Sequence, residues 1–220
     1  MMTHPKGTIG YAAVASRYIK VTDDLPFDLL HKDFLPFLPI DKGLVLDLGA
    51  GPGRDAYEMS LRGHMVLAVE PLLEFRVAGE QRCGKESSVQ WIDDALPLLG
   101  KLTGCENEFD FILSSGVWHH LTPGEQELGM RRAAQLLKPA GVFALSLRNG
   151  PAGVGTHVFP THCRRLLSVA EEEDLTALLC LESQPSLLEG KEQVKWSSLV
   201  LQKAPHPRTV SAVNQNQNSL

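Results

Sequence analysis

Three glycines at alternating positions, Gly49, Gly51 and Gly53, follow a short apolar run over residues 44–48. Glycine lets a backbone come close to a ligand, and a turn of this kind exposes backbone amides at the N-terminus of the helix that follows. Such a helix is expected over residues 54–62. The stretch therefore predicts a strand, a tight turn that holds a ligand, and a helix; a tight turn without a ligand is the alternative. Its G-x-G-x-G spacing differs from the G-x-G-x-x-G of a dinucleotide site.

The alternation of apolar runs and helical patterns continues along the chain. Four further runs predict strands, over residues 65–69, 89–92, 109–114 and 142–147. The clearest helix begins at residues 122–125, because Thr-Pro-Gly-Glu is a capping box with proline at the first helical position. Strands that alternate with helices at this spacing predict an α/β fold with a mostly parallel, doubly wound sheet.

The last part of the chain has a different order of elements. A helix is expected near residues 164–173, and two extended runs follow over residues 175–181 and 194–202. Because no helix separates these two runs, they predict a hairpin at the edge of the sheet, with one antiparallel strand. Together with the five earlier runs, they predict a seven-stranded sheet.

The first forty residues predict two helices. One is expected over residues 11–20 and another after Asp23 and Asp24, which can cap it. The second helix carries an apolar stripe at three- and four-residue spacing, formed by Phe27, Leu30, Phe34 and Leu38. A length of 220 residues favours a single α/β domain. Its predicted parts are a helical cap (1–40), a ligand-binding core (41–150), a substrate-side loop, helix and hairpin (151–203), and a disordered tail (204–220).

Charge and composition narrow the classes of partner. The 21 basic and 26 acidic residues give a net charge of -5, which disfavours nucleic acid as a partner. No run approaches the ~18 apolar residues of a membrane span, and no signal peptide is recognised, so a cytoplasmic protein is expected. The cysteines have no C-x-x-C spacing, so neither a metal site nor a redox pair is predicted. They are Cys83, Cys105, Cys163 and Cys180.

Five segments in order resemble motifs of the class I S-adenosylmethionine (SAM)-dependent methyltransferases. Asp47, two positions before the first glycine, completes a segment like motif I, and Glu70 ends the second predicted strand. Residues 91–97 are similar to the family's D-A-x-x-L-P segment, in a shortened form. Residues 109–121 resemble its F-D-x-V-x-S-x-x-x-x-H-H-L motif, and residues 137–142 its L-K-P-G-G segment with alanine in place of one glycine. The resemblance covers about residues 11–202.

This resemblance implies a Rossmann-like fold, SAM as the cofactor and S-adenosylhomocysteine (SAH) as its product. Asp47 and the glycine turn would hold the methionine part, and Glu70 the ribose, whose two hydroxyls a carboxylate can accept. Asp94 would meet the adenine, although the shortened segment leaves Asp93 as an alternative. Tyr11, Arg17 and Tyr18 look like the helix that closes over the cofactor in small-molecule methyltransferases. The complete predicted cofactor set is Tyr11, Arg17, Tyr18, Asp47, Gly49, Ala50, Gly51, Gly53, Glu70, Pro71, Asp93, Asp94, Ala95, Ser114 and Ser115.

Two of these interpretations have plain structural alternatives. Arg17 can pair with the cofactor carboxylate, a charge-assisted contact, or it can be a solvated side chain on an amphipathic helix. Arg148, at the end of the fifth predicted strand, would suit an anionic acceptor or form a structural ion pair with an acidic residue on a helix.

The expected reaction is an in-line methyl transfer from a sulfonium, so much of the catalysis can come from alignment. A base is needed only if the acceptor must lose a proton, and His119 is the first candidate, with His120 second. Both histidines can instead serve packing. The predicted catalytic residues are His119, His120 and Arg148, and no metal is expected. The predicted acceptor is an O, N or C atom of a small molecule, with an anionic molecule as one option. The chain is expected to be a monomer or homodimer. The alternatives are a protein or RNA methyltransferase and a non-catalytic SAM-binding subunit.

Overall fold

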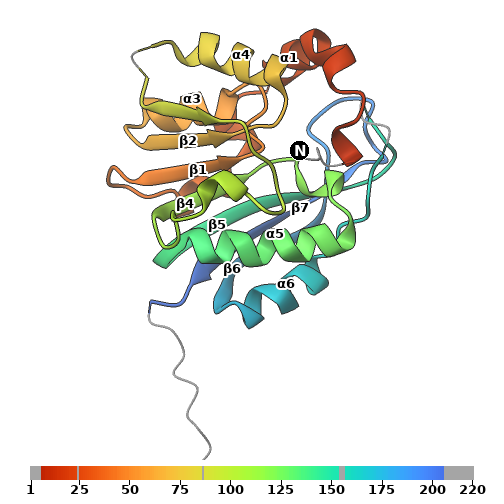
Figure 1. Ribbon diagram of the computed structural model, residues 1–220. Coiled ribbons are helices and arrows are strands. Elements are labelled where there is room, and N and C mark those ends of the chain that lie inside the picture. Colours follow the sequence, from red (N-terminus) through yellow and green to blue (C-terminus); the bar gives the residue numbers. More distant parts are fainter. Residues whose placement is uncertain (1–5, 24, 86, 154–156, 206–220) are drawn as a thin grey trace, which may run out of the picture.

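The computed structural model describes residues 6–23, 25–85, 87–153 and 157–205. Its centre is a seven-stranded sheet in the order β3-β2-β1-β4-β5-β7-β6, with helices on both faces (Figure 1). The strands are β1 Leu44–Leu48, β2 Met65–Val69, β3 Val89–Ile92, β4 Phe109–Ser114, β5 Leu137–Asn149, β6 Leu175–Pro185 and β7 Lys195–Lys203. The α-helices are α1 Ala15–Asp23, α2 Phe27–Leu30, α3 Arg54–Leu61, α4 Leu73–Cys83, α5 Pro123–Leu136 and α6 Cys163–Glu172.

The strand pairing creates the place where a ligand can enter. Strands β1 to β5 are parallel, whereas β7 runs antiparallel to both β5 and β6. From β1 the chain proceeds to β2 and β3 on one side, and then returns to β4 and β5 on the other. The loops that follow β1 and β4 therefore leave the sheet in opposite directions, and a crevice opens at their carboxyl ends. The predicted α/β fold with an antiparallel edge hairpin is confirmed.

The two faces of the sheet are buried by different helices. Alternate residues of β1 separate into the two cores, since neighbouring side chains on a strand point to opposite faces. Leu46 and Leu48 pack in the cluster that contains α5 and α6, and Val45 packs with α3 and the N-terminal segment. Trp118 is fully buried in the first cluster, and its indole N–H donates to Ser114 Oγ at 3.1 Å. That hydrogen bond fixes the loop after β4, which forms one wall of the crevice.

The capping box of α5 is confirmed in both directions. The backbone N–H of Glu125 donates to Thr122 Oγ1 at 3.4 Å, and the backbone N–H of Thr122 donates to Glu125 Oε2 at 2.7 Å. Two of the N–H groups that a helix start leaves without partners are thereby satisfied. The helix passes at Leu136 directly into β5, which is longer than the run that predicted it.

The N-terminal region differs from the prediction. The second helix is one turn long, α2, and its N-cap is Pro26, with no side-chain cap. Asp23 instead belongs to α1, so its predicted capping role is wrong, and Asp24 lies outside the described residues. The apolar stripe nevertheless packs on the sheet: Phe27 and Phe34 are buried there, although the backbone after α2 forms turns rather than a continued helix.

Two further expectations concern membrane-spanning helices and the C-terminal tail. None of the helices in the described ranges is long and apolar enough to cross a membrane. Most of the predicted tail, residues 206–220, lies outside the described part of the chain.

Candidate functional site

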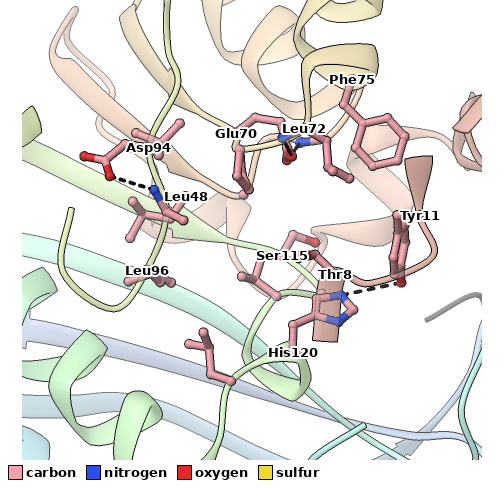
Figure 2. Close-up of a pocket in the computed structure, with 18 of the residues that line it drawn as sticks. Thr8, Tyr11, Leu48, Glu70, Leu72, Phe75, Asp94, Leu96, Ser115 and His120 are labelled. Atoms are coloured by element: carbon pink, nitrogen blue, oxygen red, sulfur yellow. Dashed lines mark hydrogen bonds between the residues drawn. The ribbon is translucent and has the colours of Figure 1, made fainter. Parts of the chain in front are cut away.

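An open pocket lies at the carboxyl ends of β1, β2 and β4, and its empty space, part of which is open solvent, is about 670 Å³ (Figure 2). Its wall combines the loops after β1 to β4 with the N-terminal segment. The predicted residues that line it are Tyr11, Tyr18, Gly49, Gly51, Glu70, Pro71, Asp94, Ala95, Ser115 and His120. Lining residues that the sequence did not single out for the site include Thr8, Leu72, Phe75, Leu99, Gly116 and Val117. These are mainly apolar or small, and only their closeness to the motifs could have indicated them.

The glycine turn is held against the end of β2. The backbone N–H groups of Gly49 and Ala50 both donate to the Val69 carbonyl, at 2.9 and 3.0 Å. The N–H of Gly51 donates to Glu70 Oε2 at 2.9 Å. All three turn glycines have positive φ, the backbone region that L side chains rarely adopt. The turn is thus a fixed cradle rather than a loose loop.

Glu70 joins the glycine turn to the loop after β2. Its second oxygen, Oε1, accepts from the Leu72 N–H at 2.8 Å. Burial raises the pKa of this carboxyl to about 7, and the two amide hydrogen bonds oppose the rise. An ionised carboxylate has about four acceptor positions, so acceptor capacity is left for a ligand that donates hydroxyl groups. This geometry is compatible with the predicted ribose contact.

Asp47 lies beneath the turn and not on the cavity wall. It is 1% exposed, and its Oδ2 has no hydrogen-bond partner within the described residues. Burial and the neighbouring Asp55 raise its pKa well above the usual range, whereas Arg54 acts in the opposite direction. Asp55 in turn lies 3.0 Å from His31 Nε2 and contacts Arg54. The role of Asp47 toward a methionine group stays a prediction, and its unpaired oxygen is compatible with it.

The structure separates the two candidates for the adenine carboxylate. Asp94 lines the cavity and is 4% exposed; its oxygens accept from the backbone N–H groups of Ala95 at 2.8 Å and Lys101 at 2.7 Å. Asp93 instead pairs with Arg76 at 3.0 Å and is not a lining residue. The arrangement favours Asp94 of the two.

We therefore expect Asp94→Asn to weaken SAH binding and Asp93→Asn to leave it within about twofold. The first change replaces the two charged carboxylate oxygens by one neutral amide oxygen, which cannot accept from both backbone N–H groups. We expect the free energy of SAH binding to weaken by about 1–3 kcal/mol. The second removes a half-exposed ion pair, which contributes little. Isothermal titration of both variants with SAH checks this. A larger loss for Asp93→Asn would reverse the assignment.

Tyr11 closes one side of the cavity. Its ring meets Tyr18, Phe75 and His120 edge-on, with centroid distances of 5.3, 6.2 and 5.2 Å. Its hydroxyl lies 3.5 Å from His120 Nε2, at the outer limit of a hydrogen bond (Figure 2). Arg17 is exposed and does not line the cavity, so the structure does not bring it to the other predicted residues. Of the three predicted N-terminal residues, the two tyrosines line the cavity and Arg17 does not.

The structure places the two histidines differently with respect to the cavity. His120 lines the cavity, whereas His119 is behind it, edge-on to Trp196 at 6.5 Å. Burial lowers the pKa of His120 to about 4, with Arg148 adding to the effect and a hydrogen bond involving Gly7 opposing it. Burial, His120 and Arg148 lower the pKa of His119 well below its usual value. Both imidazoles are therefore neutral at neutral pH, and only His120 is in a position to meet a ligand in this cavity.

Arg148 is a buried cation without an acidic partner in the described structure. It is 9% exposed, and Nη2 donates to the Pro151 carbonyl at 2.7 Å. Nη1 is buried and has no hydrogen-bond partner among the described residues, and no carboxylate there lies at ion-pair distance. Its charge acts on Tyr11, His119 and His120, but it is not on the wall of the cavity itself. The predicted alternative of an ion pair with a helix acid is thus not found in the described part of the chain.

The remaining predicted residues support the wall from behind. Ser114 is fully buried, and its hydroxyl donates to the Leu48 carbonyl at 3.3 Å. Gly53 is the N-cap of α3, and Ala50 is buried under the turn. None of these three lines the cavity, whereas Ser115 does.

Comparison with known proteins matches the central part of the chain, which supplies most of this site. Residues 45–141 match a protein family described as a methyltransferase domain. The described strands have the sheet order of the class I SAM-dependent methyltransferase fold, and the matched residues form its central part. The domain contains the glycine turn, Glu70, Asp94 and both histidines, which confirms the resemblance seen in the sequence.

Relatives and solved structures agree with this assignment. An "uncharacterized methyltransferase" of Bacillus mycoides is 29% identical over 141 residues, which are 62% of this chain and 57% of the relative. The match thus spans less than three fifths of that relative. A TehB-like SAM-dependent methyltransferase from Corynebacterium glutamicum shares the fold with a TM-score of 0.61 and 20% identity, over 87% of this chain and 97% of that one. The 1,6-didemethyltoxoflavin-N1-methyltransferase of Burkholderia thailandensis has a TM-score of 0.59 and 21% identity, over 93% and 92%.

Proposed function

We propose that this chain is an active enzyme that transfers the methyl group of SAM to an O, N or C atom of a small molecule and releases SAH. One observation carries the proposal. Within a methyltransferase domain, the glycine turn and Glu70 line a cavity at the point where the strand order reverses. That is where open α/β sheets bind nucleotide-like ligands.

The residues present fit this cofactor. Glu70 keeps acceptor positions for ribose hydroxyls, Asp94 is placed for the adenine, and Gly51 presents open space at the cavity wall. When bound, SAM supplies a methyl group on a positively charged sulfur, which is already activated for transfer. The work left to the chain is to align the acceptor with that methyl group and to keep water out. Tyr11, packed against Phe75 and His120, covers the cavity on the side of the N-terminal segment.

We further propose an anionic group on the acceptor, recognised by Arg148. A buried guanidinium without a compensating anion is costly, so a carboxylate at Nη1 would offset that cost. Arginine also matches the planar geometry of a carboxylate with paired donors. The neutral His120 nearby, on the cavity wall, can accept a proton where the acceptor must lose one.

The names of structural relatives support a small-molecule acceptor by analogy. The Burkholderia thailandensis structure holds 1,6-didemethyltoxoflavin together with SAH. A magnesium protoporphyrin IX methyltransferase of Synechocystis, with a TM-score of 0.64 and 13% identity, was solved with SAM. At these identities the likeness concerns the fold, so the acceptor of this chain rests on its own residues. Three further points stay predictions. They are a single methyltransferase domain over residues 1–203, a cytoplasmic location, and a monomeric or homodimeric state.

The first experiment compares ligands by thermal unfolding. A ligand at 100 times its Kd stabilises the native state by about 2.7 kcal/mol. For a chain of this size we expect SAM or SAH to raise Tm by about 5–10 °C and NAD to leave it unchanged. Incubation with methyl-labelled SAM and a panel of small carboxylates, amines and phenols then tests transfer. The absence of a Tm shift with SAM and SAH at millimolar concentration would contradict the proposal. SAH binding without transfer to any acceptor would favour a non-catalytic subunit.

Arg148→Met provides the matched variant for the anionic acceptor. Methionine fills similar apolar space without the charge, so SAH affinity should change less than about twofold. With a carboxylate acceptor from the panel, KM should rise at least about tenfold, the loss of one charge-assisted contact. An unchanged KM would remove Arg148 from acceptor binding while leaving methyl transfer itself intact.

A further inference from the structure

Two thiols and a carboxylate come together outside the cavity. Cys163 is the first residue of α6, and Cys180 and Glu182 belong to β6 at the edge of the sheet. The sulfur atoms and a carboxylate oxygen all lie within 4.8 Å of one another. Figure 1 shows α6 beside β6, on the side of the sheet away from β3. None of the three residues lines the cavity.

The fold explains why these side chains meet. Residues two apart on a strand point to the same face, so Cys180 and Glu182 share the face of β6 on which α6 packs. The pairing of β6 with β7 is irregular just beyond them, where Ser183 has a φ of 58° and its N–H donates to Ser197 Oγ at 3.3 Å. Cys163 enters from the helix and is only 6% exposed. The group is therefore built from two elements and has a buried side.

We propose that Cys163, Cys180 and Glu182 bind a zinc ion, with water in the fourth position. Two thiolates and a carboxylate are a donor set that suits Zn²⁺, which accepts sulfur and oxygen ligands in tetrahedral geometry. The absence of C-x-x-C spacing does not count against the site, because its two thiols come from separate elements. A bound ion would tie the start of α6 to the edge strand.

The protonation state of the thiols makes the proposal measurable. An ordinary cysteine thiol has a pKa of about 8.5 and is mostly protonated at neutral pH. Both are therefore thiols at neutral pH before a metal binds. Zinc binds thiolates, so each ion that enters displaces the two thiol protons into solution. An intramolecular disulfide is the competing state of the same pair; it would require an oxidant to remove two electrons and two protons.

The test uses the full chain, reduced, freed of metal and carrying no purification tag. Titration with Zn²⁺ against a chromophoric chelator should show a single high-affinity ion per chain. In weakly buffered solution at pH 7, about two protons should be released per ion. Cys180→Ser and Glu182→Gln alter exposed positions and are expected to fold. The first should weaken binding at least about tenfold and lower the proton release to about one. The second should weaken binding at least about threefold.

Cys83→Ser is the matched control, because this partly buried thiol is not one of the three ligands, and binding should stay within about twofold. Zinc affinity equal in wild type and Cys180→Ser would overturn the proposal. So would zinc binding without proton release. A disulfide between Cys163 and Cys180, located by peptide mass mapping of the protein purified without reductant, would assign the pair to a disulfide instead. None of these readings depends on methyl transfer.

Discussion

Glu70→Gln is expected to weaken SAH binding by about 10- to 100-fold, or about 1.4–2.8 kcal/mol. Glu70 accepts hydrogen bonds from the backbone N–H groups of Gly51, in the turn after β1, and Leu72, in the loop after β2. A glutamine side chain has a single oxygen, so one of these N–H groups loses its partner and the negative charge is lost as well. The variant therefore damages the cradle and the proposed ribose contact together. Isothermal titration with SAH measures the loss.

Glu74→Gln is the control for this prediction. It removes the same charge four residues later, from an exposed position on α4. Its SAH affinity should match that of the wild type within about twofold. If Glu70→Gln also binds SAH normally, Glu70 does not hold the ribose.

The pH dependence of binding gives the same residue a second readout. Burial raises the pKa of Glu70 to about 7 from an ordinary value of 4.5. Between these values the folded, ligand-free state holds a proton that the unfolded state has released, so the contribution of Glu70 to stability falls as pH rises from about 4.5 to 7. Hydroxyl donors favour the ionised form, so SAH affinity should decrease below pH 7, by up to about tenfold per pH unit. The dependence should be weaker in Glu70→Gln, with the remainder attributable to Asp47, whose pKa is also raised.

The sheet could be predicted well because its signals are local. Strands β1 to β4 and the capping box at Thr122 and Glu125 were expected at nearly their observed bounds. Strands β1, β2 and β4 are largely buried on both faces and so are mostly apolar in sequence. The N-terminal region was harder, because Phe27 and Phe34 have helical spacing but reach the sheet from a single turn followed by irregular backbone. Spacing on its own does not distinguish a helix from turns that bury the same side chains.

The candidate site was predictable in its position and less so in its side chains. The order of the motifs predicted that the site lies at the carboxyl ends of the strands. The direction of each side chain, however, depends on packing between elements that are distant in the sequence. Neighbouring residues therefore have opposite surroundings: Asp94 is on the wall and Asp93 in an ion pair, while His120 is on the wall and His119 behind it. Arg148 is the reverse case, where the sequence suggested a charge partner and the structure leaves one guanidinium nitrogen unpaired among the described residues.

The second large effect is expected from Gly53→Ala, which should destabilise the fold by about 2–5 kcal/mol. Alanine at a φ of +80° costs about 1–2 kcal/mol. Its methyl carbon would also lie 2.9 Å from the backbone Cα of Gly79 and 2.9 Å from the Trp91 ring. Neither can move easily, and overpacking of this kind costs about 1–3 kcal/mol more. Thermal unfolding without ligand should show Tm lower by about 5–15 °C.

Gly51→Ala separates packing from ligand binding at the same turn. Gly51 also has positive φ, +54°, but a methyl group there would meet no protein atom within 4 Å. Only the backbone cost of about 1–2 kcal/mol should appear in its stability. Because Gly51 lines the cavity, its added methyl group should instead occupy space that the cofactor needs and weaken SAH binding more than Gly53→Ala does. Equal losses of Tm in the two variants would mean that the contact of Gly53 with Gly79 and Trp91 does not limit stability. If Gly51→Ala binds SAH normally, the cofactor does not approach this turn as closely as its open wall implies.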